Sequence, residues 1–263
     1  MRFTRVNDVN LAFYVSGHGA PVLMIMGLGG RAADWGSVPE RIAHRFEAIT
    51  FDNRGTGKSD KPDVPYNLDE MADEAVAVLH AAGHQQAHIV GVSMGGMIAQ
   101  LVALRHPQCV RKLVLLSTTP GGSHTVAPDP AAMVALIPDM TQPPETIVRT
   151  TMQAIAAPGF ADAHPEVIRS IVDTAMNAVT PQVVFVRQMA AIMASDRYPD
   201  LPNIKAPTLV IHGDADPLVP YANGQILAER IPGARLATLH NCGHLAMWEQ
   251  PAELSALLLD FLA

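Results

Sequence analysis

The chain has 263 residues, of which 49% are hydrophobic, and it carries a formal net charge of −7. This length is within the range of one large α/β domain, and the apolar share is sufficient for a substantial core. The negative charge, with no cluster of Lys or Arg, argues against a nucleic-acid-binding surface. The two cysteines, Cys109 and Cys242, can form at most one disulfide, which excludes a disulfide framework.

The N-terminal sequence lacks the apolar stretch of a signal peptide, and no apolar run approaches the length of a membrane span. We therefore expect a cytoplasmic protein that does not associate with membranes. Residues 1–9 contain a first strand, and Asn7 and Asp8 turn the chain into a second strand at about 11–15.

Apolar strands then alternate with helical patterns along the chain. Buried strands are predicted at 22–26, 47–51, 87–90 and 113–116. An apolar stripe with helical spacing covers residues 68–82, and Gly83 ends that helix. This alternation indicates a mostly parallel sheet with helices on both faces.

The segment 91–95 reads Gly-Val-Ser-Met-Gly and lies between a predicted strand and a helical pattern over 96–104. Gly-x-Ser-x-Gly in this context is the pattern of a nucleophile elbow, a turn so tight that the residues flanking the serine must be glycine. The turn would raise the Ser93 hydroxyl above the sheet edge, at the positive end of the helix dipole. Ser93 is therefore the candidate nucleophile for acyl transfer.

A serine hydroxyl needs a base to take its proton and a third group to orient that base. Downstream of Ser93, a predicted strand at 208–212 leads into a loop with Asp214 and Asp216, and a strand at 235–239 leads into His244. Loops that follow parallel strands gather at the carboxyl edge of the sheet. We therefore expect these side chains to meet Ser93 there.

Further motifs accompany the elbow. They read Met-Gly-Leu-Gly-Gly at 26–30, Asp-Asn-Arg-Gly-Thr-Gly-Lys-Ser at 52–59, Gly-x-x-Asp-x-x-x-Pro at 213–220 and His-x-x-x-x-Glu-Gln-Pro at 244–251. With them the chain resembles the α/β-hydrolase fold superfamily, in its single-domain esterase, lactonase and C–C hydrolase branch. The last motif departs from the family pattern by one extra residue between His and Glu. The resemblance covers essentially the whole chain.

The resemblance implies a mostly parallel eight-stranded sheet flanked by helices, with a helical cap inserted after the sixth strand. The core would comprise 1–119 and 203–263, and the cap 120–202. Prolines break the cap into short helices, and 183–186 fits a helix better than a strand because it follows Pro181.

The resemblance also implies the catalytic roles. Ser93 would be the nucleophile, His244 the general base and later the general acid, and Asp216 the group that orients His244. Asp214 competes for the last role, although it is better suited to capping its loop. The backbone N–H groups of Leu28 and Met94 would form the oxyanion hole.

Substrate contacts are expected from the loops at this edge and from methionines of the cap, whose flexible thioethers suit an adaptable apolar pocket. The candidates are Gly27, Gly29, Trp35, Met133, Met140, Met189 and Val219. Core packing is an equally good interpretation for Trp35. His80, His84 and His88 recur every four residues, but Gly83 breaks any helix through them, and we expect no metal site and no cofactor.

These features predict a serine hydrolase, monomeric or homodimeric, that acts on a small or medium uncharged ester or lactone. The same triad serves C–C bond hydrolases of the meta-cleavage type, enol-lactonases for anionic acids and perhydrolases, and all of these stay open. Anionic substrates would need cationic groups facing the pocket. A ligand receptor with vestigial hydrolysis is a further alternative.

Overall fold

The computed structural model describes residues 1–6, 8–136 and 141–263. Eight strands form one sheet in the order β1-β2-β4-β3-β5-β6-β7-β8. Their bounds are Arg2–Val6 (β1), Val9–Gly17 (β2), Ala20–Ile25 (β3), Phe46–Phe51 (β4), Ala87–Val92 (β5), Val110–Leu116 (β6), Thr208–Gly213 (β7) and Arg235–Leu239 (β8). β2 pairs antiparallel with both β1 and β4, and every other pairing is parallel. The mostly parallel eight-stranded sheet is therefore confirmed.

Two apolar layers cover the sheet, because successive side chains of each strand point to opposite faces. In β3, Leu23 and Ile25 belong to the cluster that includes residues of α2, α3 and α9, whereas Val22 and Met24 belong to the cluster that includes residues of α1, α10 and α11. The helices are α1 (Val38–Ile42), α2 (Leu68–Ala81), α3 (Met94–Arg105), α9 (Ala222–Arg230), α10 (Ala246–Glu249) and α11 (Pro251–Leu262).

The helix predicted over 68–82 is α2. The Asn67 side chain accepts a hydrogen bond from the Glu70 N–H and so caps the first turn. Gly83 follows the helix with φ of +101°, a conformation that favours glycine. Short 3-10 helices join other elements at Ala32–Trp35, Pro107–Cys109, Gly122–His124 and Leu201–Asn203.

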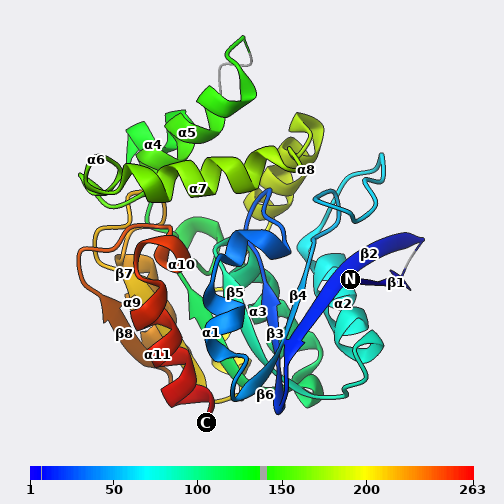
Figure 1. The fold of residues 1–263 in the computed structure, drawn as a ribbon. Helices are drawn as coiled ribbons and strands as arrows, with labels where there is room; N and C mark the ends of the chain where they lie inside the picture. The colour runs from blue at the N-terminus through cyan, green and yellow to red at the C-terminus, as the bar shows by residue number, and fades with distance from the viewer. Residues whose placement is uncertain (7, 137–140) are drawn as a thin grey trace.

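A helical cap lies between β6 and β7, as predicted. It contains α4 (Pro130–Ala135), α5 (Pro144–Ile155), α6 (Phe160–Ala163), α7 (Pro165–Met176) and α8 (Gln182–Met193). These helices form a layer across the top of the molecule, at the end opposite the C-terminus (Figure 1). The stretch 183–186 is helical and belongs to α8. Ile155, Ile168 and Val172 form the centre of a small apolar cluster that holds α5 against α7.

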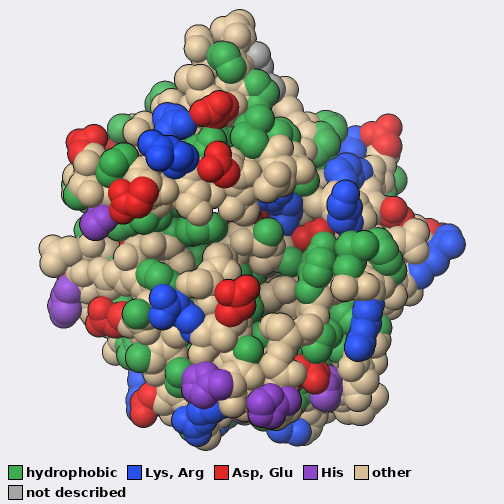
Figure 2. All heavy atoms as spheres, in the orientation of Figure 1, with side chains coloured by type: hydrophobic (Ala, Val, Ile, Leu, Met, Phe, Trp, Pro, Cys, Tyr) green, Lys and Arg blue, Asp and Glu red, His purple; other side chains and the backbone are tan. Residues whose placement is uncertain are grey.

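No helix in the described parts of the chain is long and apolar enough to cross a lipid bilayer. On the face drawn in Figure 2, Lys and Arg side chains are interspersed with Asp and Glu and form no continuous basic patch. That face offers no electrostatic footprint for a nucleic acid.

Candidate active site

Ser93 lies in the turn between β5 and α3 with φ of +55° and ψ of −123°, a strained conformation for a residue with a side chain. The turn is possible because its neighbours are small. A Cβ on Gly91 would lie 2.2 Å from the Gly95 carbonyl oxygen, and a Cβ on Gly95 would lie 2.1 Å from that of Ile25. The sequence pattern and the observed turn thus share one steric cause.

Hydrogen bonds fix the Ser93 backbone from the next strand. The Ser93 N–H donates to the Leu116 carbonyl at 2.9 Å, and the Thr118 hydroxyl donates to the Ser93 carbonyl at 2.6 Å. A Cβ on Gly96 would lie 2.5 Å from the Thr118 Cβ. The elbow therefore depends on close contact between the start of α3 and the end of β6.

His244 and Asp216 come from the loops after β8 and β7. His244 Nδ1 lies 2.8 Å from Asp216 Oδ2, and both residues are buried. The other carboxylate oxygen of Asp216 accepts the N–H groups of Leu218 at 2.9 Å and Val219 at 2.8 Å. Since a carboxylate only accepts, Nδ1 carries the proton, and Nε2 is left free to act as a base.

Asp214, the competing acid, lies elsewhere. Its carboxylate bonds to His240 Nδ1 at 2.8 Å and accepts the Asn241 N–H at 2.7 Å. The hydrogen bond from His240 lowers the pKa of Asp214. Asp214 therefore ties two surface loops together, and its carboxylate is hydrogen-bonded to His240, not to His244.

Ser93 and His244 make no hydrogen bond to each other within the described residues. In enzymes without bound substrate, catalytic hydrogen bonds are often long and tighten only in the complex. The Ser93 side chain is partly accessible, as a nucleophile requires.

The loop after β3 lies against Ser93. A Cβ on Gly27 would lie 3.1 Å from the Ser93 Cβ, so a larger residue would crowd the nucleophile. Met94 is the first residue of α3, where a backbone N–H has no acceptor within the helix. No acceptor for the Leu28 N–H is found in 1–6, 8–136 or 141–263. Two unpaired donors thus lie near Ser93, one on the loop after β3 and the other at the start of α3.

Glu249 holds the backbone around His244, a role that the sequence did not reveal. Its carboxylate accepts the N–H groups of Gly243 at 2.8 Å, Leu245 at 3.0 Å and Ala157 at 3.0 Å. Burial raises the pKa of Glu249, and the three N–H donors partly offset that rise. The His244 N–H in turn donates to the Ile155 carbonyl at 2.9 Å. The His244 loop is therefore bonded to the end of cap helix α5.

His212 is a second residue that sequence reasoning missed. It is fully buried at the end of β7, and its Nε2 donates to the Val219 carbonyl at 2.7 Å, because a carbonyl can only accept. The same Nε2 lies 3.7 Å from Asp216 Oδ2. Burial lowers the pKa of His212, so the ring stays neutral. It supports the Asp216 loop through the Val219 carbonyl and adds no positive charge beside the Asp216 carboxylate.

The predicted substrate contacts divide into groups. Gly27 lies beside Ser93, and Val219 is bonded to Asp216. Gly29 faces the cap, since a Cβ there would lie 3.6 Å from the Phe185 ring. Trp35 requires a correction: its side chain is fully buried in the cluster that includes residues of α1, α10 and α11, where it packs in the core and has no access to a substrate.

The cap methionines do not form one group. Met133 and Met189 are half-buried, Met152 packs against the α5–α7 cluster, and Met193 is 76% exposed. Met140 lies outside the described residues. Any apolar pocket would therefore draw on only some of the cap methionines.

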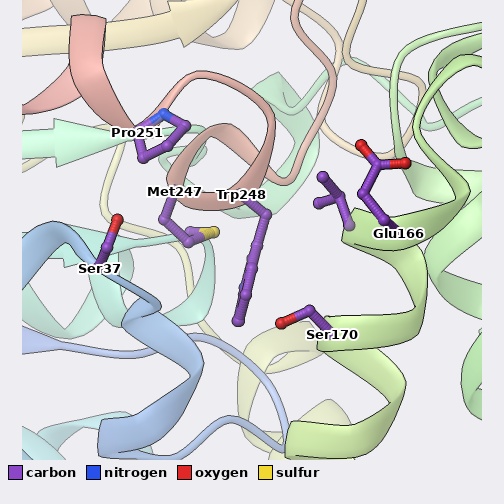
Figure 3. Close-up of a pocket in the computed structure, with 7 residues that line it drawn as sticks. Ser37, Glu166, Ser170, Met247, Trp248 and Pro251 are labelled. Atoms are coloured by element: carbon purple, nitrogen blue, oxygen red, sulfur yellow. The ribbon is translucent and has the colours of Figure 1, made fainter.

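A separate groove of about 280 Å³ lies between cap helix α7 and the α10–α11 segment (Figure 3). Its lining includes Glu166 and Ser170 from α7 and Trp248 from α10, and none of the three candidate catalytic residues. In the chain as described, no three His, Cys, Asp or Glu side chains are grouped so that they could hold a metal ion. The groove and the three candidate catalytic residues are therefore separate features of the molecule.

Comparisons with known proteins agree with this fold. Residues 20–251 match the family described as "alpha/beta hydrolase fold". The chain is 33% identical to a 2-hydroxymuconate semialdehyde hydrolase of Pseudomonas sp. (strain CF600), with 94% of this chain and 88% of that protein covered. It is 30% identical to a putative carbamate hydrolase, RutD, of Stutzerimonas stutzeri (strain A1501), with 93% and 92% covered.

Among solved structures, Est816, described as an N-acyl homoserine lactone degrading enzyme, superposes with a TM-score of 0.85 at 31% identity. The match covers 99% of this chain and 100% of Est816. The family match, the identities and the shared architecture lead to one conclusion: this chain is a hydrolase and belongs to the alpha/beta hydrolase fold family.

Proposed function

We propose that this hydrolase cleaves an uncharged carboxylic ester or lactone through an acyl-enzyme on Ser93. His244 Nε2 takes the proton of the Ser93 hydroxyl as the oxygen attacks the carbonyl carbon. The N–H groups of Leu28 and Met94 stabilise the resulting oxyanion. His244 then protonates the leaving alcohol, and a water molecule activated by the same ring releases the acid.

The observation that carries this proposal is the buried 2.8 Å contact between His244 Nδ1 and Asp216 Oδ2. A buried carboxylate that accepts this bond fixes the tautomer in which Nε2 is the base, and it stabilises the imidazolium that forms when the proton moves. The strained Ser93 backbone supports the same assignment, because such strain clusters at functional sites.

The charges of the cap favour a neutral substrate. Three of its four arginines pair with carboxylates on the surface, Arg149 with Glu145, Arg187 with Asp63 and Arg197 with Asp200. Arg169 is exposed on α7. A substrate carboxylate would need a cation that is not already engaged, so an ester or lactone without a charge near the scissile bond fits this site better.

C–C bond hydrolysis is the second candidate, because the relative at 33% identity carries the name of a 2-hydroxymuconate semialdehyde hydrolase. The same nucleophile, base and oxyanion donors could serve such a reaction. The two candidates differ in what the site must recognise, since a muconate-type substrate carries an anionic group and a simple ester does not.

The test is steady-state hydrolysis of p-nitrophenyl esters from acetate to decanoate and of unsubstituted lactones, with wild type beside Ser93→Ala. We expect turnover with an optimum chain length in wild type, and a loss of several orders of magnitude in the variant. Rapid turnover of a meta-cleavage product, with none on esters or lactones, would replace the proposal with the second candidate.

A further inference from the structure

Cap helix α8 packs directly on loops at the carboxyl edge of the sheet, here called the catalytic edge because Ser93, Asp216 and His244 lie there as candidate catalytic residues. Its Val184 and Phe185 lie over two of those loops, since a Cβ on Gly55 would lie 2.3 Å from Val184 and one on Gly29 would lie 3.6 Å from Phe185. Between these loops the helix places one polar side chain, Gln188, with no exposed surface. A buried amide must find hydrogen-bond partners, so its contacts are informative.

Gln188 bridges the two loops. Its Oε1 accepts the Gly29 N–H at 2.7 Å, and its Nε2 donates to the Arg54 carbonyl at 3.0 Å. A second cap residue completes the arrangement, because the Thr180 hydroxyl donates to the Gly29 carbonyl at 2.9 Å. Gly29 itself has φ of +69°, so the loop bends at this residue. The cap thus bonds both polar groups of the residue that follows Leu28.

We propose that Gln188 is a positioning residue for the oxyanion hole. By holding the Gly29 N–H, it fixes the peptide plane next to the one that carries the Leu28 N–H. This inference rests on the proposed function, in which the Leu28 N–H binds the oxyanion. A glutamine amide of this length both accepts and donates, whereas a methionine or an ionised carboxylate of similar size cannot do both.

A positioning role predicts a specific kinetic change. In Gln188→Met, which keeps the volume and removes both bonds, kcat on the best p-nitrophenyl ester should fall about tenfold to thirtyfold, with KM within twofold of wild type. A trifluoromethyl ketone forms a tetrahedral adduct on the serine whose oxyanion occupies the hole. Its inhibition constant should rise by the same factor as kcat falls.

The conservative variant Gln188→Glu gives a pH readout. An ionised carboxylate there would still accept the Gly29 N–H but would repel the Arg54 carbonyl, whereas a protonated one would restore both bonds. Burial should raise the pKa of the introduced carboxyl. The activity of Gln188→Glu relative to wild type should therefore increase as the pH is lowered from 8.5 to 6.

Arg187→Met is the matched control. Arg187 is the adjacent residue on α8 and also ties the cap to the core, through Asp63 and the Pro62 carbonyl, but it has no bond to the oxyanion loop. This variant should keep kcat, the inhibition constant and the pH profile of wild type. An equal loss in Arg187→Met would mean that loosening of the cap is responsible, and would overturn the inference.

Thr180→Val and Gln188→Glu keep the inference testable if Gln188→Met does not fold. Thr180→Val, at a partly exposed position, should lower kcat about threefold without changing KM. Wild-type kcat and inhibition in both of these variants would contradict the role of Gln188. Failure of the proposed function would look different: the trifluoromethyl ketone would not inhibit wild type, and Ser93→Ala would remain active.

Discussion

The catalytic edge of the core and the cap above it are built in different ways. α3, which begins at the elbow, buries ten of its twelve residues, whereas α5 of the cap buries only Ile155. The elbow is fixed by backbone contacts that leave room for glycine alone. The cap is joined to the edge through a few polar side chains, among them the buried Gln188 and the half-buried Glu249.

This difference indicates that the core and the cap contacts affect the site in different ways. Steric constraints in the core set the positions of the nucleophile and its helix, and they leave little freedom for change. The polar contacts between cap and core hold the loops that carry Gly29 and His244. Substitutions in the core should therefore affect the chemistry or the fold outright, while substitutions at the cap contacts should tune the rate.

The largest expected effect is on kcat and distinguishes Asp216 from Asp214, the two carboxylates in the loop after β7. Asp216→Asn should lower kcat on the preferred ester about 10³-fold to 10⁴-fold, because the amide would favour the wrong tautomer of His244. Asp214→Asn should retain kcat near wild type, since its partners are His240 and Asn241. The assignment is wrong if steady-state kinetics show the reverse order.

A pair of glycines sharpens the contrast in packing. Gly95→Ala should destabilise the protein by more than about 3 kcal/mol or prevent folding, because a Cβ would lie 2.1 Å from the Ile25 carbonyl oxygen. Gly159→Ala, in the cap, meets no atom within 4 Å and should cost only about 1 kcal/mol for its φ of +80°. Urea unfolding measures both, and equal losses would refute the contrast.

Glu249→Gln tests the contact between the cap and the His244 loop. An amide cannot accept all three N–H groups and places its own donors among them, so kcat should fall about tenfold with little change in KM. The control is Glu253→Gln, an exposed carboxylate in the first turn of α11. Wild-type kcat in Glu249→Gln would show that the His244 loop does not depend on this carboxylate.

The smallest expected effect concerns His88, in β5 of the sheet, and the free energy of unfolding at low pH. Burial, with Lys112 and Arg111 nearby, lowers the pKa of His88 from 6.5 to about 4. The unfolded chain therefore binds the proton more tightly, and the folded state loses stability as the pH falls from about 6.5 toward about 4.

His88→Gln should reduce the loss of unfolding free energy between pH 7 and pH 5 by on the order of 1 kcal/mol, allowing for solvent screening. Urea unfolding at both pH values measures the change. The control His80→Gln, at an exposed position of α2, should leave the pH dependence as in wild type. An unchanged loss in His88→Gln would exclude this histidine as the source.

The sequence was most informative where one local constraint determines the structure. The glycines around Ser93, the continuous apolar runs of the central strands and the apolar stripe of α2 each follow from sterics or burial within a short segment, and their elements were predicted correctly. Trp35 shows the limit of this approach, because a tryptophan near a loop can pack inward or outward, and only the surrounding core decides.

The polar supports of the site could not be predicted. Gln188 follows Arg187 in α8 and stands in no recognisable motif, and its partners, Gly29 and Arg54, are more than a hundred residues away. Glu249 belongs to a recognisable motif, but its three N–H donors become neighbours only when the cap is in place. Such networks depend on tertiary contacts that no local pattern encodes.

The central claim is that the reaction passes through an acyl-enzyme on Ser93, and intact-mass spectrometry tests it most directly. Wild-type enzyme mixed with its preferred p-nitrophenyl ester and quenched in acid during the first turnovers should gain the mass of one acyl group, located on the peptide that contains Ser93. Ser93→Ala should gain none. Steady turnover with no adduct on Ser93, or undiminished turnover in Ser93→Ala, would contradict the account.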